Sequence, residues 1–294
     1  PQIAFRRDAA KTAQHPLPNV GVALTNFSAH PPPQPPFAIE ASETGWWLVY
    51  LLEQLGHQPL LSHPKQTKAI AAARLKNDRV DAERLALLLR GDLLPTVWIP
   101  SAALREAREL IRHRIQLVWV RGIIRNRLQA MLARRNLQPT SGQSWLTQRG
   151  QRALQHLPLT ETPSRIREDC AALLPTLDAQ VRRLDAELVA RWGRDPRVQR
   201  LMTIPGIGPF IAIVLVLELG DIQRFAHAKQ VASYDGLTPR VRASAGRVRA
   251  GHISKEGNRL LRWVLELAAT QAIPRPGPLA APRCSGIFCG RTGC

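Results

Sequence analysis

The chain has 294 residues, a length that accommodates about two domains. Hydrophobic residues make up 45% of the sequence, which excludes an intrinsically disordered chain and provides enough apolar side chains for a core. The formal net charge is +19, from 41 Lys and Arg against 22 Asp and Glu, and this excess predicts a polyanionic partner such as nucleic acid.

The first hundred residues alternate between short apolar runs and helical patterns. Strands are expected at 3–5, 20–24, 37–40 and 59–62, and helices at 44–56, 65–75 and 78–90. A proline-rich stretch at 31–36 interrupts this order, because proline lacks an amide donor and fixes its own φ. The alternation of strands and helices predicts an α/β domain.

Two long helices are predicted next. Ser101 is a suitable N-cap for a helix that runs to about Arg135, and Leu177, Val181 and Leu184 lie at helical spacing in the second helix. This pattern is typical of an antiparallel pair or a coiled-coil dimerisation arm, although two ordinary amphipathic helices would share it. A helical C-terminal domain is expected from Asp195.

The segment 204–209, with the sequence IPGIGP, precedes an apolar helical run. It resembles a helix-hairpin-helix DNA-binding motif, in which glycines let the backbone approach a phosphate and the N–H groups of the next helix bind the anion. Pro205, Gly206 and Gly208 are therefore predicted to contact DNA. The alternative is a turn between two ordinary packed helices.

A basic segment rich in small residues follows. It is expected to be a flexible loop that leads into a helix at 258–269 and binds the DNA backbone. The predicted DNA-binding residues here are Arg247, Arg249, Lys255, Asn258 and Arg259. A serine in this setting can attack a phosphodiester while arginines stabilise the developing charge, so Ser244 and Ser254 are candidate nucleophiles. Either serine can equally be a helix cap or a loop residue.

Carboxylates form the other candidate site. Asp78 and Asp81 lie three positions apart on a predicted helix and project from one face, Glu40 ends a predicted strand, and Asp8 follows a short apolar run. Carboxylates that converge on one spot can hold two Mg²⁺ ions for phosphoryl transfer. Each of them alone can also be a solvated residue near a helix start.

The remaining features point away from secretion and membranes. The four cysteines match neither a zinc motif nor a disulfide framework, and the longest apolar run, 210–217, is too short to span a bilayer. No apolar signal core is present at the first residues. We therefore expect a cytoplasmic, nucleoid-associated protein without membrane contact.

Four segments together resemble the DEDD insertion-sequence transposases that are related to the Piv invertase and guided by a bridge RNA. They are KNDRVDA at 76–82, LPTVWIP at 94–100, the PGIG turn, and the segment 251–262. Their order and spacing match the family, and the resemblance covers residues 38–269. It implies α/β plus all-α architecture, with a RuvC-like (RNase H-like) domain at 1–98, a long helical coiled-coil arm at 101–192, and a helical transposase domain with a helix-hairpin-helix motif at 195–272. A disordered tail is expected at 273–294.

The resemblance also implies roles for individual residues. The catalytic and metal-binding set would consist of four carboxylates: Asp8, Glu40, Asp78 and Asp81. Glu43 competes with Glu40, because the local sequence carries one extra residue against the family pattern. The family's serine nucleophile matches Ser244 best, with Ser254 as the alternative.

The function implied is that of a DNA transposase or site-specific recombinase. It would cut and rejoin insertion-sequence ends by Mg²⁺-dependent phosphoryl transfer, with a transient phosphoserine link formed by the serine of a partner subunit. A structured guide RNA would pair with donor and target DNA, and the protein would be a homo-dimer or homo-tetramer.

Two departures from the family pattern give further hypotheses. The stretch between Asp8 and Glu40 is shorter than in the family, and the final family helices are missing after Ala269. Degenerate ends of this kind predict a catalytically impaired remnant that still binds nucleic acid. A RuvC-like junction resolvase without serine chemistry is the third hypothesis, and the C-terminal serine segment argues against it.

Overall fold

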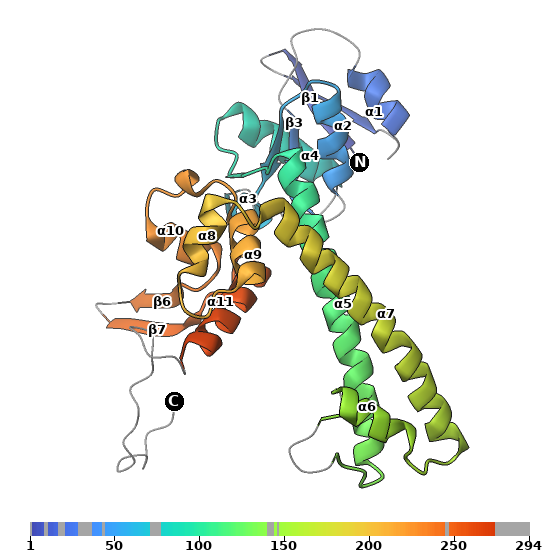
Figure 1. Ribbon diagram of the computed structural model, residues 1–294. Helices are drawn as coiled ribbons and strands as arrows, with labels where there is room; N and C mark the ends of the chain where they lie inside the picture. The colour runs from blue at the N-terminus through green and yellow to red at the C-terminus, as the bar shows by residue number, and fades with distance from the viewer. Residues whose placement is uncertain are drawn as a thin grey trace. The chain divides into compact units, whose positions relative to one another are not determined.

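The computed structural model describes residues 2–8, 11–16, 21–28, 37–42, 45–70, 78–139, 144–145, 147–244 and 247–273. Over these residues the chain is mostly helical with small sheets, and it divides into two compact units, Pro1–Ala102 and Ala103–Cys294 (Figure 1). None of the described helices combines the length and the apolar character needed to cross a membrane.

The first unit contains two small sheets. In one, β1 (Gln2–Asp8) pairs antiparallel with β2 (Lys11–Pro16). In the other, β4 (Pro59–Ser62) lies between β3 (Phe37–Glu40), to which it is parallel, and β5 (Thr96–Val97), to which it is antiparallel. The helices of this unit are α1 (Gly21–Ser28), α2 (Trp46–Gln54), α3 (Pro64–Ile70) and α4 (Asp78–Arg90).

Most of these elements match the sequence-based expectations. The strands at 37–40 and 59–62 and the helix at 78–90 are confirmed with the same bounds. The strand expected at 20–24 is wrong, because α1 occupies 21–28. An apolar run of four or five residues fits a helix as well as a strand, so its period could not decide between them. The proline-rich stretch at 31–36 lies outside the described residues.

Two long helices open the second unit. α5 (Ala102–Ala133) and α7 (Glu161–Trp192) are joined through the short α6 (Gln148–Gln155). Ion pairs link them along their length: Arg114 with Asp185 at 2.8 Å, Arg121 with Asp178 at 2.7 Å, and Arg125 with Asp178 at 3.2 Å. Residues early in α5 pair with residues late in α7, so the helices run antiparallel.

The rest of the unit is a helical bundle that carries one β-hairpin. Its elements are α8 (Pro196–Met202), α9 (Pro209–Leu219), the short 3₁₀ helix η2 (Ile222–Arg224), α10 (Ala228–Tyr234), β6 (Pro239–Ser244), β7 (Arg247–Ile253) and α11 (Arg259–Ala272). The flexible basic loop expected after Ser244 is therefore wrong, because β6 and β7 pair antiparallel. Arginines alternate with Val and Ala along both strands, which is the two-residue period of a strand.

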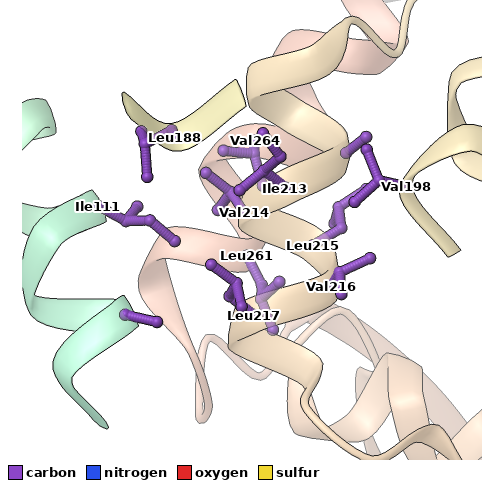
Figure 2. Close-up of a cluster of buried hydrophobic side chains, with 12 residues drawn as sticks. Ile111, Leu188, Val198, Ile213, Val214, Leu215, Val216, Leu217, Leu261 and Val264 are labelled. Carbon is purple, nitrogen blue, oxygen red and sulfur yellow. The ribbon is translucent and has the colours of Figure 1, made fainter. Parts of the chain in front are cut away.

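Helix α9 forms the centre of the core. All of its residues from Ala212 to Glu218 are buried, so the helix is surrounded by partners rather than packed along one stripe. Figure 2 shows these partners, which come from α5, α7, α8 and α11: Ile111, Leu188, Val198, Leu261 and Val264. The first turns of α5 and the last turns of α7 therefore share one core with the C-terminal helices.

The turn that leads into the hairpin buries a carboxylate. Asp235, at the C-terminus of α10, is only 3% exposed, and its Oδ1 has no hydrogen-bond partner among the described residues. The Arg262 side chain donates to the Asp235 carbonyl oxygen at 2.7 Å. Burial raises the pKa of Asp235 to about 6, although the nearby Arg262 charge opposes the shift.

The core predicts a clear difference between two truncations. Ile213 is fully buried on α9, so we expect Ile213→Ala to lower the free energy of unfolding by about 2–5 kcal/mol through lost burial and a new cavity. Val189→Ala is the control, because Val189 is 47% exposed on α7 and its truncation should change stability by no more than about 0.5 kcal/mol. Urea denaturation followed by circular dichroism measures both, and equal losses would contradict this assignment of the core.

Asp235 predicts a pH dependence of stability. Its folded-state pKa of about 6 lies above the usual 3.8, so the folded chain holds this proton more tightly than the unfolded chain does. The resulting stabilisation is complete below about pH 4 and is lost as the pH rises through about 6. Asp235→Asn removes this titration, and the wild type should lose up to about 3 kcal/mol relative to the variant between pH 4 and pH 7.

Urea denaturation of both proteins at pH 4, 5.5 and 7 tests this dependence. The exposed Asp169 provides a matched control, and Asp169→Asn should follow the wild type at each pH. A constant difference between wild type and Asp235→Asn across this range would show that Asp235 does not titrate there.

Candidate nucleic-acid interface and catalytic residues

The candidate carboxylates of the first unit lie on three elements that are in contact. Asp8 is the last residue of β1, Glu40 is the last residue of β3, and Asp78 and Asp81 lie in the first turn of α4. Helix α4 lies against both β1 and β3. The backbone therefore brings the elements that carry the four positions together.

The side-chain geometry of this set is only partly described. Glu40 is exposed, and a partly exposed Asp81 pairs with Arg84 at 3.9 Å. The side chains of Asp8 and Asp78 lie outside the described part of the chain, as does Glu43. Among the side chains that are described, no three His, Cys, Asp or Glu residues form a group that could hold a metal ion. Convergence of the four carboxylates therefore stays a prediction.

The turn between α8 and α9 contains the predicted glycine contacts. Gly206 is buried with a φ of 91°, and a Cβ there would lie 2.4 Å from the carbonyl oxygen of Ala268 on α11. Packing against α11 therefore explains why this position is glycine. Gly208, by contrast, is exposed at the N-cap of α9, and a Cβ there would meet nothing within 4 Å.

The approach to the N-terminus of α9 is open. A hollow of about 560 Å³ is lined by residues 202–208, including the exposed Pro205, and by Gln271 of α11. Gly208 provides no side chain to cap the helix, and Pro209 occupies the first helical position. Backbone N–H groups at such a helix start carry a partial positive charge and suit a phosphate.

The hairpin of β6 and β7 carries the first serine candidate at its tip. Ser244 ends β6 and pairs with Arg247, and Arg242 pairs with Arg249. Residues that are two apart on one strand, or directly opposite on two, fall on the same face of a sheet. The Ser244 position therefore shares its face with three arginine positions, while the side chains themselves lie outside the described residues.

Ser254 and Lys255 lie at the base of the hairpin. The Ser254 amide donates to the Thr238 carbonyl at 2.8 Å, and its hydroxyl oxygen accepts from the Glu256 amide at 3.4 Å. Lys255 has a φ of 54°, and its amide donates to the Gly236 carbonyl at 3.1 Å. Ser254 therefore takes part in a local turn, one of the two roles that the sequence left open for it.

Asn258 and Arg259 begin α11. The Asn258 side-chain oxygen accepts from the Leu260 and Leu261 amides at 2.9 and 3.2 Å and so caps the helix. Its side-chain nitrogen donates to Glu218 Oε2 at 2.7 Å. Asn258 was predicted to bind DNA, but both polar atoms of its side chain are engaged within the protein. Arg259, which was also predicted to bind DNA, is exposed.

Glu218 is a residue that sequence reasoning missed. It is the only acidic residue in the segment 209–219, whose other members are apolar apart from the proline at its start. It is completely buried and accepts hydrogen bonds from Arg112 of α5 and from Asn258. A lone carboxylate in an apolar helix is a usable signal, because burial of a charge requires partners from other elements.

Two sequence families match the chain in separate regions. Residues 11–136 match a DEDD family of IS110 type described as a transposase, and this range includes Glu40, Asp78 and Asp81. Residues 198–283 match the family described as Transposase IS116/IS110/IS902, and this range includes the α8–α9 turn, the hairpin and α11.

Curated relatives extend across both regions. The chain is 29% identical over 238 residues to a protein of Pseudomonas aeruginosa named "Probable family 20 transposase", and the match covers 78% of this chain and 68% of that protein. It is 28% identical over 247 residues to the transposase for insertion sequence element IS1328 of Yersinia enterocolitica, covering 83% of this chain and 72% of that protein.

A third relative, y4qE of Sinorhizobium fredii, also carries a transposase name. The identity is 30% over 239 residues, and the match covers 81% of this chain and 59% of that protein. The chain thus spans 59–72% of the lengths of these three relatives. Because two regions of the chain, 11–136 and 198–283, match transposase family models of this type, the chain belongs to the IS110/IS116/IS902 family of insertion-sequence transposases.

Proposed function

We propose that the chain is a DNA transposase that cuts and rejoins the ends of an insertion element, with Ser244 as its nucleophile. The observation that carries this proposal is the hairpin register, in which Ser244 pairs with Arg247 and the Arg242–Arg249 pair lies two positions along on the same face. A phosphodiester that approached this face would meet a hydroxyl position among three cationic positions. Arginine suits this task because its planar group binds phosphate oxygens in pairs.

The proposed step is a phosphoryl transfer. The Ser244 oxygen gives up its hydroxyl proton and forms a bond to phosphorus while the bond from phosphorus to one bridging backbone oxygen breaks, and the departing oxygen takes up a proton, so that the step is neutral in protons. Arginines of the hairpin stabilise the negative charge that develops on the non-bridging oxygens. Ser254 suits this role less well, because its hydroxyl oxygen already accepts from the Glu256 amide.

The first unit is proposed to be a RuvC-like domain that binds Mg²⁺. The proposed ligands Asp8, Glu40, Asp78 and Asp81 are all carboxylates, the oxygen donors that Mg²⁺ prefers, and their elements lie in contact. Bound Mg²⁺ would supply stabilisation of charge on phosphoryl oxygens. The role of the chain is to hold the carboxylates at strand ends and on one helix face, so that they need little reorganisation on binding.

The α8–α9 turn is proposed to bind the DNA backbone as a helix-hairpin-helix element. Gly208 and the open N-terminus of α9 would receive a phosphate, and Pro205 and Gly206 would shape the turn. At the hairpin and at α11, the cationic residues Arg247, Arg249, Lys255 and Arg259 would bind further phosphates. Such contacts place the protein on DNA without reading its sequence.

The α5–α7 helix pair is proposed to be an arm through which copies associate as a dimer or tetramer. Trp119 and Ile123 lie one turn apart on α5 and are 61% and 46% exposed, and Leu173 on α7 is 53% exposed. Exposed apolar side chains at this spacing suit a partner helix. A structured guide RNA is the remaining proposed partner, and a net charge of +19 suits a protein that holds two polyanions.

Strand cleavage tests the nucleophile. With a donor-end DNA, the element's RNA and Mg²⁺, a denaturing gel should show a covalent protein–DNA band. Ser244→Ala should abolish the band by removing the attacking oxygen, whereas Ser254→Ala should retain it. Loss of the band only in Ser254→Ala would move the nucleophile, and absence of any band with salt-sensitive DNA binding intact would favour a remnant that only binds nucleic acid.

A matched pair of substitutions tests phosphate binding at α9. Asp and Asn have nearly the same shape and both cap helices well, so Gly208→Asp and Gly208→Asn should both fold. Only Asp places a negative charge where a phosphate is expected, and Gly208→Asp should bind DNA about tenfold more weakly than Gly208→Asn at ~0.1 M salt. Fluorescence anisotropy measures both affinities. Equal affinities would exclude a phosphate at this helix start.

A further inference from the structure

Glu218 is the hub of a buried polar network in the second unit. Its carboxylate accepts from Arg112 Nη2 at 3.1 Å through Oε1, accepts from Asn258 at 2.7 Å through Oε2, and lies 3.7 Å from Arg108 Nε. Arg108 is itself buried and donates to the Leu217 and Glu218 carbonyls at 2.9 and 2.6 Å. Burial lowers the pKa of Arg108, and the Glu218 charge opposes that shift. The network thus joins α5 to the C-terminal end of α9.

Asn258 extends this network to the base of the hairpin. Its backbone amide donates to the Tyr234 carbonyl at 3.0 Å, its side chain caps α11, and its remaining polar group donates to Glu218. Two further backbone bonds close the base, from Lys255 to Gly236 and from Ser254 to Thr238. The polypeptide between these closures is the β6–β7 hairpin with Ser244 at its tip. Asn258 is therefore the residue at which the hairpin base meets the buried carboxylate.

Gly236 and Gly257 at this base are packed closely against neighbouring backbone. A Cβ on Gly257 would lie 2.2 Å from the Tyr234 carbonyl oxygen, and one on Gly236 would lie 2.9 Å from the Glu256 amide nitrogen and carbonyl oxygen. The two chain segments thus pass each other at backbone contact distance. A shift of Asn258 would therefore move the segment that joins β7 to α11 rather than being absorbed by a loose loop.

We infer that Glu218 is a positioning residue for the nucleophile hairpin. By holding Asn258 against α9, and by pairing with Arg112 of α5, its carboxylate fixes where the hairpin emerges and hence where Ser244 meets the DNA. This inference rests on the proposed function of Ser244. In this role Glu218 contacts neither the DNA nor the metal and acts on the Ser244 position through Asn258.

Stability alone gives a weak reason for a carboxylate here. Burying a charge requires it to lose its water, and well-packed apolar residues often replace a buried ion pair with no loss of stability. Every other residue of α9 beyond its N-terminal proline is apolar. What a carboxylate adds at position 218 is directed bonds to two separate elements, α5 and the start of α11. Directed bonds fix geometry, which apolar packing does less sharply.

A reciprocal swap tests this role. Glu218→Gln leaves one oxygen and one NH2 to face two donors, Arg112 and Asn258, so one of the two bonds is lost, and Asn258→Asp places two carboxylates face to face. The double variant Glu218→Gln/Asn258→Asp restores a donor–acceptor pair with its polarity reversed, and Asp still caps α11. Asn258→Ser is the milder second variant, since its hydroxyl keeps the cap but does not reach Glu218. Glu187→Gln is the control, because among the described residues Glu187 forms its ion pair with Arg191 on the surface of α7.

The first readout is the single-turnover rate of covalent adduct formation at saturating DNA, measured beside the Kd for DNA. Misplacement of a reacting group by about 1 Å can lower a rate ~100-fold, so each single variant should lose ~10- to 100-fold in rate with Kd changed less than about threefold. The double variant should recover at least about tenfold over the slower single variant. If the rate of the double variant fell by the product of the two single-variant losses, the positioning role would be overturned. A change in Kd for DNA without a change in rate would overturn it as well.

The second readout does not need catalysis. Amide hydrogen exchange across 237–258 should accelerate in Glu218→Gln, Asn258→Asp and Asn258→Ser, and should return toward the wild-type rate in the double variant. If the wild type forms no adduct, the proposed serine chemistry fails, and exchange alone decides whether Glu218 holds the hairpin. Unchanged exchange in all three single variants would overturn the inference.

Discussion

The buried Glu218 carboxylate is the constraint around which the second unit is organised. A charge at the end of an apolar helix is tolerated only where several donors surround it, and the donors come from α5 and from the residue that caps α11. The same carboxylate therefore links the long helix pair, the central core helix and the base of the hairpin. The residues that it bonds, Arg112 and Asn258, lie 106 and 40 positions away from it in sequence.

Ion pairs within the protein also narrow the set of arginines that are candidates for phosphate contact. A net charge of +19 predicts a nucleic-acid partner, yet many arginines of α5 are already engaged within the protein. Arg114, Arg121 and Arg125 pair with aspartates of α7, and Arg112 pairs with Glu218. Cationic positions on the hairpin and at the start of α11 are therefore better candidates for phosphate contact than those that hold the helix pair together.

The sequence predicted regular elements well and long-range partners poorly. The helices at 78–90 and 102–133 follow from apolar periodicity, whereas the hairpin was missed although its arginines alternate with small apolar residues. Gly206 and Gly208 look equivalent in the motif, and only the approach of α11 separates a packing glycine from an exposed one. Glu218 was missed because its partners lie 40 and 106 residues away. The carboxylate set rests on family resemblance and on strand and helix ends.

The most direct test of the central claim is to identify the residue that carries DNA in the proposed covalent intermediate. Trapped adduct would be digested with trypsin and nuclease and the nucleotide-bearing peptide sequenced by mass spectrometry. Cleavage after Arg242 and Arg247 separates Ser244 from Ser254, which lies on the peptide ending at Lys255. A nucleotide on Ser244 in the peptide 243–247 is the result predicted here. A nucleotide on any other residue would contradict the assignment of the hairpin tip as the catalytic centre.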